Sequence, residues 1–181
     1  MKKFELTNEF VVDSFGIKLF RIRSLVAFGC VKAGEQGGYV EKEENLSQID
    51  NAWVYGNAEV SGNAKVTGNA RVSGNAWVYG NAWVHGNAEI SDNAWVSGDA
   101  EVSGNAWVSS NVDYATVKGF GRFNRNTTFF RCKDGKVCVV CGCFFGDLEG
   151  FRTIVKSTHG DGRMAMEYLA IADLMEIHFK G

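Results

Sequence analysis

Proline is missing from this chain of 181 residues, which contains 22 glycines. Because proline has no backbone N–H and interrupts a strand ladder, its absence leaves every residue able to donate a backbone hydrogen bond. Glycine adopts the left-handed backbone angles that tight corners require. The two features together indicate a chain that turns often and is rich in strand ladders.

The chain also lacks an excess of either charge and any long apolar run. The 19 basic and 21 acidic residues leave a formal charge of −2, so no overall positive field favours nucleic acid or anionic lipid. The N-terminus becomes polar within a few residues, and no stretch of about 18 apolar residues follows. We therefore expect a cytoplasmic protein with no signal peptide, no membrane contact and no direct sequence-specific nucleic-acid binding.

Five cysteines are an odd number in a chain without secretion signals, which favours reduced thiols over disulfides. Cys138 and Cys141 form a CxxC pair, and Cys132 and His159 are near them in the sequence. These are residue types that bind zinc, but the spacing is compressed and a distant second pair is missing. We therefore assign no metal site and expect free thiols packed in a strand.

A six-residue repeat fills the middle of the chain. Positions 51–110 form ten consecutive units of the pattern Asn-Ala-x-Val-x-Gly. The Ala position never varies, and the other positions have few exceptions, namely Ile90, Asp92, Asp99 and Ser110. Such regularity over ten units predicts a solenoid.

The repeat specifies which side chains face inward. Ala and Val are two residues apart, so on an extended strand both point to one side and the x residues point to the other. Gly and Asn at the junction of two units tolerate the positive φ of a corner. Three sides of six residues close a triangular coil of about 18 residues, and each coil is buried against its neighbours. The fold class predicted is mainly β, a parallel β-helix.

The pattern continues weakly upstream. Gly38 and Val40, then Leu46, occupy the Ala and Val positions, and Gln48 breaks the phase. Residues 4–12 and 17–30 are apolar around a polar turn and predict a β-hairpin that covers the first coil.

The C-terminal part predicts a second hairpin followed by two helices. Strands are expected around 128–130 and 137–145. Asp147 can cap the first helix and Gly160 can end it. We therefore divide the chain into an N-terminal β cap over 1–36, a β-helix over 37–118 and a small C-terminal α+β (ββαα) domain over 119–181.

The repeat resembles the hexapeptide pattern of left-handed β-helix proteins, which implies a left-handed coil. The N-terminal half is also similar to bacterial hexapeptide-repeat proteins described as transferases. Hexapeptide acyltransferases carry a catalytic histidine and bind coenzyme A between the subunits of a trimer. Here His85 is the histidine of the repeat, and no loop insertion interrupts residues 51–110. We therefore expect no enzyme activity, no catalytic residue and no cofactor, and keep coenzyme A-dependent acyl transfer as an alternative.

Aromatic side chains occupy many outward positions. Equivalent positions of successive coils stack on one face, so Trp77, Tyr79 and Trp95 should form a contiguous patch. Exposed aromatic patches usually mark interaction sites, although the rings could instead shield their own sheet or lie beneath a terminal domain. The predicted partner-binding residues are Trp77, Tyr79, Trp95, Trp83, His85, Trp53 and Trp107.

The chain as a whole resembles a family common in phages and mobile elements of gut Firmicutes. The resemblance rests on the N-terminal segment, the repeat, and the C-terminal Cys141-Gly142-Cys143-Phe144-Phe145-Gly146 segment. Some members are anti-CRISPR proteins that block a type II effector nuclease. This resemblance implies stoichiometric binding to a host defence nuclease in the bacterial cytoplasm. A homodimer or trimer and a rod that assembles end to end are further alternatives.

Overall fold

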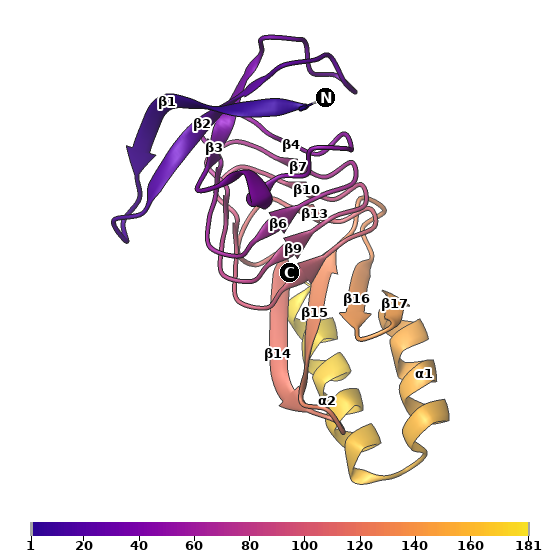
Figure 1. Ribbon diagram of the computed structural model, residues 1–181. Coiled ribbons are helices and arrows are strands. Elements are labelled where there is room, and N and C mark those ends of the chain that lie inside the picture. The colour runs from indigo at the N-terminus through magenta and orange to yellow at the C-terminus, as the bar shows by residue number, and fades with distance from the viewer. Residues whose placement is uncertain (1, 181) are drawn as a thin grey trace.

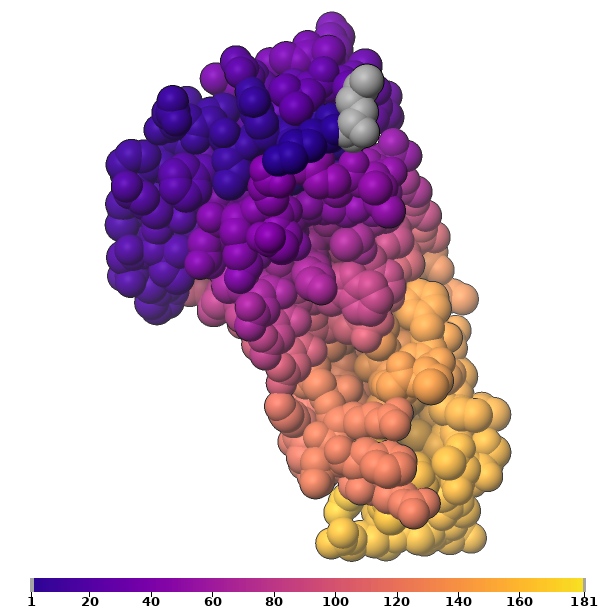
Figure 2. Space-filling view, viewed as in Figure 1, coloured from indigo at the N-terminus to yellow at the C-terminus, as the bar shows by residue number. Residues whose placement is uncertain are grey.

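The computed structural model describes residues 2–180 as an elongated molecule with three parts (Figure 1). A strand-rich cap covers one end of a central rod, and a sheet with two helices covers the other. Figure 2 shows the N-terminal hairpin projecting sideways from the rod, which gives the molecule a concave outline below the hairpin.

The central rod is a parallel β-helix built from very short strands. Between Trp53 and Val108 the strands are β4 Trp53–Val54, β5 Glu59–Val60, β6 Lys65–Val66, β7 Arg71–Val72, β8 Trp77–Val78, β9 Trp83–Val84, β10 Glu89–Ile90, β11 Trp95–Val96, β12 Glu101–Val102 and β13 Trp107–Val108. Each pairs with the equivalent strand of the next coil, as in the register Trp95↔Trp77 and Val96↔Val78. With β3 (Gln36–Val40) included, the sides of the rod are the parallel series β3-β5-β8-β11, β4-β7-β10-β13 and β6-β9-β12. The predicted β-helix is confirmed, and its left hand stays a prediction.

The Ala and Val positions fill the interior of the rod. Every one of them from Ala52 to Val108 is at most 1% exposed. The Asn positions form ladders along the corners, where the amide of Asn51 donates to Asn69 at 3.0 Å and Asn69 donates to Asn87 at 3.0 Å. Small and aliphatic side chains therefore stack inside while amides stack outside.

The corners need positive φ, which glycine supplies at most of them. Gly74 has φ 70°, and a Cβ built there would lie 2.8 Å from the backbone nitrogen of Asp92 on the next coil. Asp92 itself replaces a glycine and adopts φ 54°. Coil spacing and corner conformation thus both restrict the residue at position 74.

The N-terminal cap continues one side of the rod. Strands β1 Phe4–Val12 and β2 Lys18–Ser24 form the predicted antiparallel hairpin, and β2 pairs with β3 Gln36–Val40. A short 3₁₀ helix, η1 Glu43–Asn45, follows. Gln48, which breaks the phase of the repeat, binds the N-terminal cap. Its side chain accepts from the backbone N–H of Lys3 at 2.8 Å and donates to the carbonyl of Phe4 at 3.2 Å.

A lysine is buried beneath this cap. The Lys3 ammonium donates to the carbonyls of Asp50 at 3.0 Å and Ala52 at 2.8 Å, and lies 3.7 Å from the Asp50 carboxylate. Burial lowers the pKa of Lys3 to about 8, because desolvation outweighs the attraction to Asp50. The protonated form of Lys3 is therefore less favourable in the folded protein than in the unfolded chain.

A four-stranded antiparallel sheet closes the other end of the rod. Its strands are β14 Tyr114–Phe120, β15 Arg125–Arg131, β16 Val137–Cys141 and β17 Phe144–Asp147, two more than the predicted hairpin. Neighbouring residues point to opposite faces, so Phe130 and Val140 join the rod core while Phe129 and Val139 join a second core under the helices. One face of the sheet therefore closes the core of the rod, and the opposite face packs in the core under the helices.

Two helices cover the far face of this sheet. They are α1 Leu148–His159 and α2 Arg163–His178. As predicted, the Asp147 carboxylate caps α1 by accepting from the Gly150 N–H at 2.9 Å, and Gly160 follows its last turn. Among residues 2–180, no helix is long and apolar enough to span a bilayer.

The expectation of fully reduced cysteines is wrong. Cys132 and Cys138 form a disulfide, whereas Cys30, Cys141 and Cys143 are free. The turn between β15 and β16 brings the two residues together, with Cα atoms 6.2 Å apart, a separation that suits a disulfide. The sequence count of cysteines could not reveal this local pairing.

The corners offer a matched test of coil stacking. Gly98 has φ 68° but nothing within 4 Å of a Cβ added there, so Gly98→Ala should cost only the left-handed strain, about 1 kcal/mol of unfolding free energy. Gly74→Ala adds a clash with the Asp92 backbone and should cost at least about 1 kcal/mol more. Urea denaturation measures both, and equal losses would contradict the close approach of the coils.

The buried lysine predicts a pH dependence of stability. The unfolded chain holds the Lys3 proton with a pKa near 10.5 and the folded chain with a pKa of about 8, so stability should rise with pH between these values. Relative to Lys3→Met, the unmodified protein should gain on the order of 3 kcal/mol across this range. Chemical denaturation at several pH values tests this. Lys2→Met is the control, because Lys2 is exposed, and a parallel pH profile for Lys3→Met and the unmodified protein would refute the prediction.

Candidate protein-binding surface

Two tryptophans form the centre of the predicted patch. Trp77 on β8 and Trp95 on β11 are register partners, and their rings stack with centroids 5.2 Å apart and an interplanar angle of 11°. Trp77 is half-buried, and Trp95, on the last strand of this sheet, is 47% exposed. The spacing of one coil therefore produces the contiguous aromatic face that the sequence predicts.

The patch extends to Tyr79 and to the tip of the N-terminal hairpin. Phe15, in the turn between β1 and β2, lies 6.4 Å from Tyr79 between ring centroids and is 71% exposed. The Asp13 carboxylate shapes this turn by accepting from the N–H groups of Phe15 and Ile17 at 2.8 Å. We call Phe15, Trp77, Tyr79 and Trp95 the aromatic surface. The repeat pattern gives no sign that Phe15 belongs to this surface, because only the fold brings the hairpin tip to the second and third coils.

A shallow hollow and two acidic groups border the aromatic surface. The hollow, about 370 Å³, lies between Trp95, Tyr79 and Tyr114 of β14. On the other side are Asp13 and Glu59, and burial together with the nearby Asp13 raises the pKa of Glu59 above its usual value. The surface thus offers rigid rings with a mildly acidic edge.

A second aromatic pair occupies another side of the rod. The rings of Trp83 and His85 stack at 4.1 Å, and the Trp83 indole N–H donates to the Thr67 hydroxyl at 3.1 Å. His85 Nε2 lies 3.1 Å from a carboxylate oxygen of Glu101. Trp83 is 44% exposed. These contacts hold His85 against the side of the rod, away from the aromatic surface.

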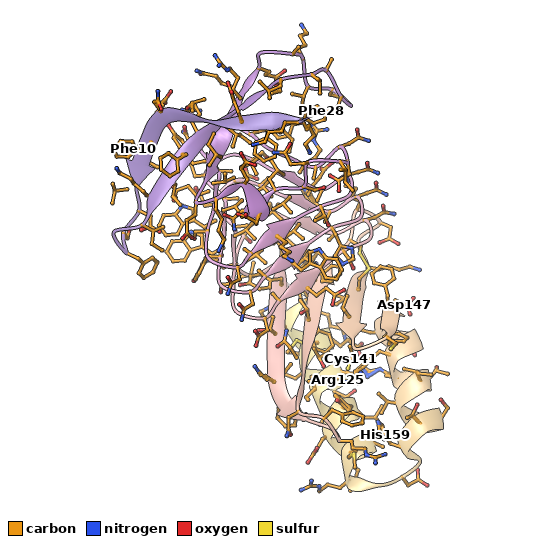
Figure 3. All side chains as sticks on the ribbon, viewed as in Figure 1. Phe10, Phe28, Arg125, Cys141, Asp147 and His159 are labelled. Carbon is orange, nitrogen blue, oxygen red and sulfur yellow. A yellow bond between two sulfur atoms is a disulfide. The ribbon has the colours of Figure 1, made fainter. Side chains whose placement is uncertain are left out.

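The third side carries one exposed and one buried tryptophan. Trp107 is 48% exposed, but Trp53 is fully buried, so the prediction that Trp53 binds a partner is wrong. Phe4 and Phe28 pack edge-on against the Trp53 ring at 6.1 and 5.4 Å. Figure 3 shows Phe28 at the capped end of the rod. The N-terminal segment covers the first coil, and Trp53 belongs to the cap contact.

The residues considered as metal ligands do not come together. In residues 2–180 no group of three or more His, Cys, Asp or Glu side chains is placed to hold a metal ion. Cys132 and Cys138 are bonded to each other, which removes two of the four sequence candidates. His159 instead stacks on Tyr168, with centroids 6.0 Å apart.

Part of the rod matches a known repeat family. Residues 70–86 match the family described as YdcK Beta solenoid repeat. This segment contains β7 to β9 and four of the predicted contact residues. The comparison with curated proteins gives no match. The local match and the stacked coils together support a β-solenoid repeat fold.

The two environments of tryptophan give a direct stability test. Trp53→Ala should lose about 3 to 5 kcal/mol of unfolding free energy, because it empties a closed site under the cap. Trp95→Ala removes a half-exposed ring from one stack and should lose only about 1 kcal/mol. Urea denaturation compares them, and a small loss for Trp53→Ala would contradict its burial.

Proposed function

We propose that this protein is a non-catalytic inhibitor that binds another protein through the aromatic surface. The observation that carries the proposal is the Trp77–Trp95 stack, flanked by Tyr79 and Phe15 on a single side of the molecule. Tryptophan and tyrosine are the residues most often found as binding anchors, and exposed apolar patches of this kind are unusual on a monomer.

The scaffold behind the surface favours binding. Trp77 and Trp95 are on strands whose neighbours Val78 and Val96 are fully buried in the rod. Their backbone amides are paired or capped, since the Trp77 N–H donates to the Ala94 carbonyl at 2.9 Å and the Trp95 N–H donates to the Asn111 side chain at 2.7 Å. Rings presented by such a backbone lose little conformational entropy when they are covered.

The partner that we propose is a type II CRISPR effector nuclease in a bacterial host cell. The kind of partner rests on the resemblance of the chain to phage and mobile-element proteins described above. Asp13 and Glu59 at the edge of the aromatic surface would complement the basic surface that a nucleic-acid-binding enzyme presents.

Titration of purified type II effectors, loaded with guide RNA, tests the proposal. Cleavage of a target DNA should fall in proportion to added protein and stop near a fixed molar ratio, because a stoichiometric inhibitor needs no turnover. Unaltered cleavage by several effectors at excess protein would refute the choice of partner. Sedimentation of the protein alone distinguishes binding to another protein from self-association through the aromatic surface, because self-association would make the measured mass depend on protein concentration.

The aromatic surface itself is tested by a double variant. Trp77→Ala with Trp95→Ala should weaken the inhibitor complex by about 2 to 4 kcal/mol, the scale of anchor removal, and should leave the fold intact. The control is Trp107→Ala, which removes an equally exposed tryptophan that the sequence also predicted as a contact but that lies on another side of the rod, outside the aromatic surface. Calorimetric or surface-binding titration gives the affinities. Equal effects of the double variant and the control would exclude this surface as the contact.

The acyltransferase alternative predicts different results. Coenzyme A should then raise the melting temperature, and His85→Ala should abolish acyl transfer. A binding protein should show neither effect, so a melting shift with coenzyme A would contradict the proposed function.

A further inference from the structure

The C-terminal unit contains a cavity that the binding surface does not use. It has a volume of about 470 Å³, within the range of small-molecule sites. The β14–β15 turn, the start of β15, β16, β17 and both helices contribute its walls, and the apolar part includes Phe144, Ile154 and Met164. Figure 3 places Arg125 and Cys141 on the sheet side of this region and His159 on the helix side.

Two arginines line the cavity without a carboxylate partner. Arg122 and Arg125 lie against the Phe123 ring, with guanidinium carbons 5.4 and 4.9 Å from its centroid. Neither forms an ion pair with a carboxylate of residues 2–180. Arg152 of α1 differs because it contacts the carboxylates of Asp173 and Glu176 on α2 at 2.8 and 2.6 Å. The cavity wall therefore carries two guanidinium groups that form no ion pair within the described residues.

The local backbone makes room for one of these cations. Gly142, between β16 and β17, has φ 61°, and a Cβ there would lie only 2.2 Å from Nη1 of Arg125. A larger residue at position 142 would displace the guanidinium from the cavity wall. Gly142 thus favours the inward position of Arg125 by both conformation and space.

Polar groups with defined hydrogen-bonding roles complete the cavity. The Tyr168 hydroxyl donates to the carbonyl of Phe120 at 3.3 Å, and burial together with the neighbouring Cys141 raises the pKa of Tyr168 to about 12. It therefore stays protonated at neutral pH and adds no negative charge. The Cys141 sulfur accepts from the Thr127 hydroxyl at 3.2 Å.

We propose that this cavity binds a small organic anion, with an oxyanion group beside Arg122 and Arg125 and an aromatic or apolar body against Phe144, Ile154 and Met164. Guanidinium groups pair well with planar and tetrahedral oxyanions, and they do so more strongly beside apolar walls than in water. The site lies in the C-terminal unit and is independent of the aromatic surface on the rod.

A pair of fluorescent probes tests the proposal. The anion 8-anilinonaphthalene-1-sulfonate and the neutral N-phenyl-1-naphthylamine have the same aromatic body and differ in the sulfonate. The anion should bind at one site per chain, and Arg125→Gln or Arg122→Gln should weaken its binding about tenfold or more while changing the neutral probe less than twofold. Arg71→Gln is the matched control, because Arg71 also stacks on an aromatic ring, that of Tyr55, but lies on the rod.

The outcomes are distinguishable. Equal binding of both probes, or loss of both to the same extent in the arginine variants, would show a merely apolar site and overturn the proposal. Unchanged anion binding in both arginine variants would do the same. The melting temperature of each variant is measured alongside, and having two variants guards against one that does not fold.

Thiol labelling locates the bound probe. Cys141 lines the cavity, whereas Cys30 and Cys143 are free thiols outside it and serve as internal controls. Saturation with the anionic probe should slow modification of Cys141 by N-ethylmaleimide at least fivefold and leave the rates at Cys30 and Cys143 unchanged. Peptide mass spectrometry reads each rate, and no protection of Cys141, or equal protection of all three, would exclude binding in this cavity.

Discussion

The whole structure depends on three-sided coils that stack directly on one another. Each backbone strand contributes only two residues, such as Trp77 and Val78, and has little stability by itself. Its hydrogen bonds and its buried Ala and Val side chains all depend on the coils above and below. The residue type is therefore nearly constant where coils touch, at the interior positions and at the corners, and it varies at the outward positions.

Stacking also requires that both ends be closed. The cap does so by continuing one sheet with antiparallel strands and by covering Trp53 with Phe4 and Phe28. At the other end the sheet of the C-terminal unit places Phe130 and Val140 on the last coil. Both ends of the rod are thereby covered, which shields the terminal coils from pairing with other chains. Each also contributes to a proposed site, the Phe15 tip to the aromatic surface at one end and the arginine-lined cavity at the other.

The outward positions carry the proposed activity because they are the part of the repeat that stacking leaves free. A ring at one of these positions adds to the ladder of its side, as Trp77 and Trp95 do. Its neighbours decide whether it stays available. Trp83 is engaged by His85 and Thr67 yet remains half exposed, whereas Trp53 is closed off by residues far away in the sequence.

The sequence alone determined the rod, since a six-residue period with Ala and Val two apart places the same side chains inside whatever lies at the ends. It also determined that Trp77 and Trp95 are neighbours, because they are separated by a single coil. The start of the helix after Asp147 was predictable as well, because capping depends on local sequence. Only the tertiary structure decided that Trp53 is buried, that Phe15 reaches Tyr79, that Cys132 bonds Cys138 and that Arg122 and Arg125 share a cavity. Those outcomes depend on how non-repeating segments fold back on the rod or on each other, and such contacts have no period from which a sequence pattern could predict them.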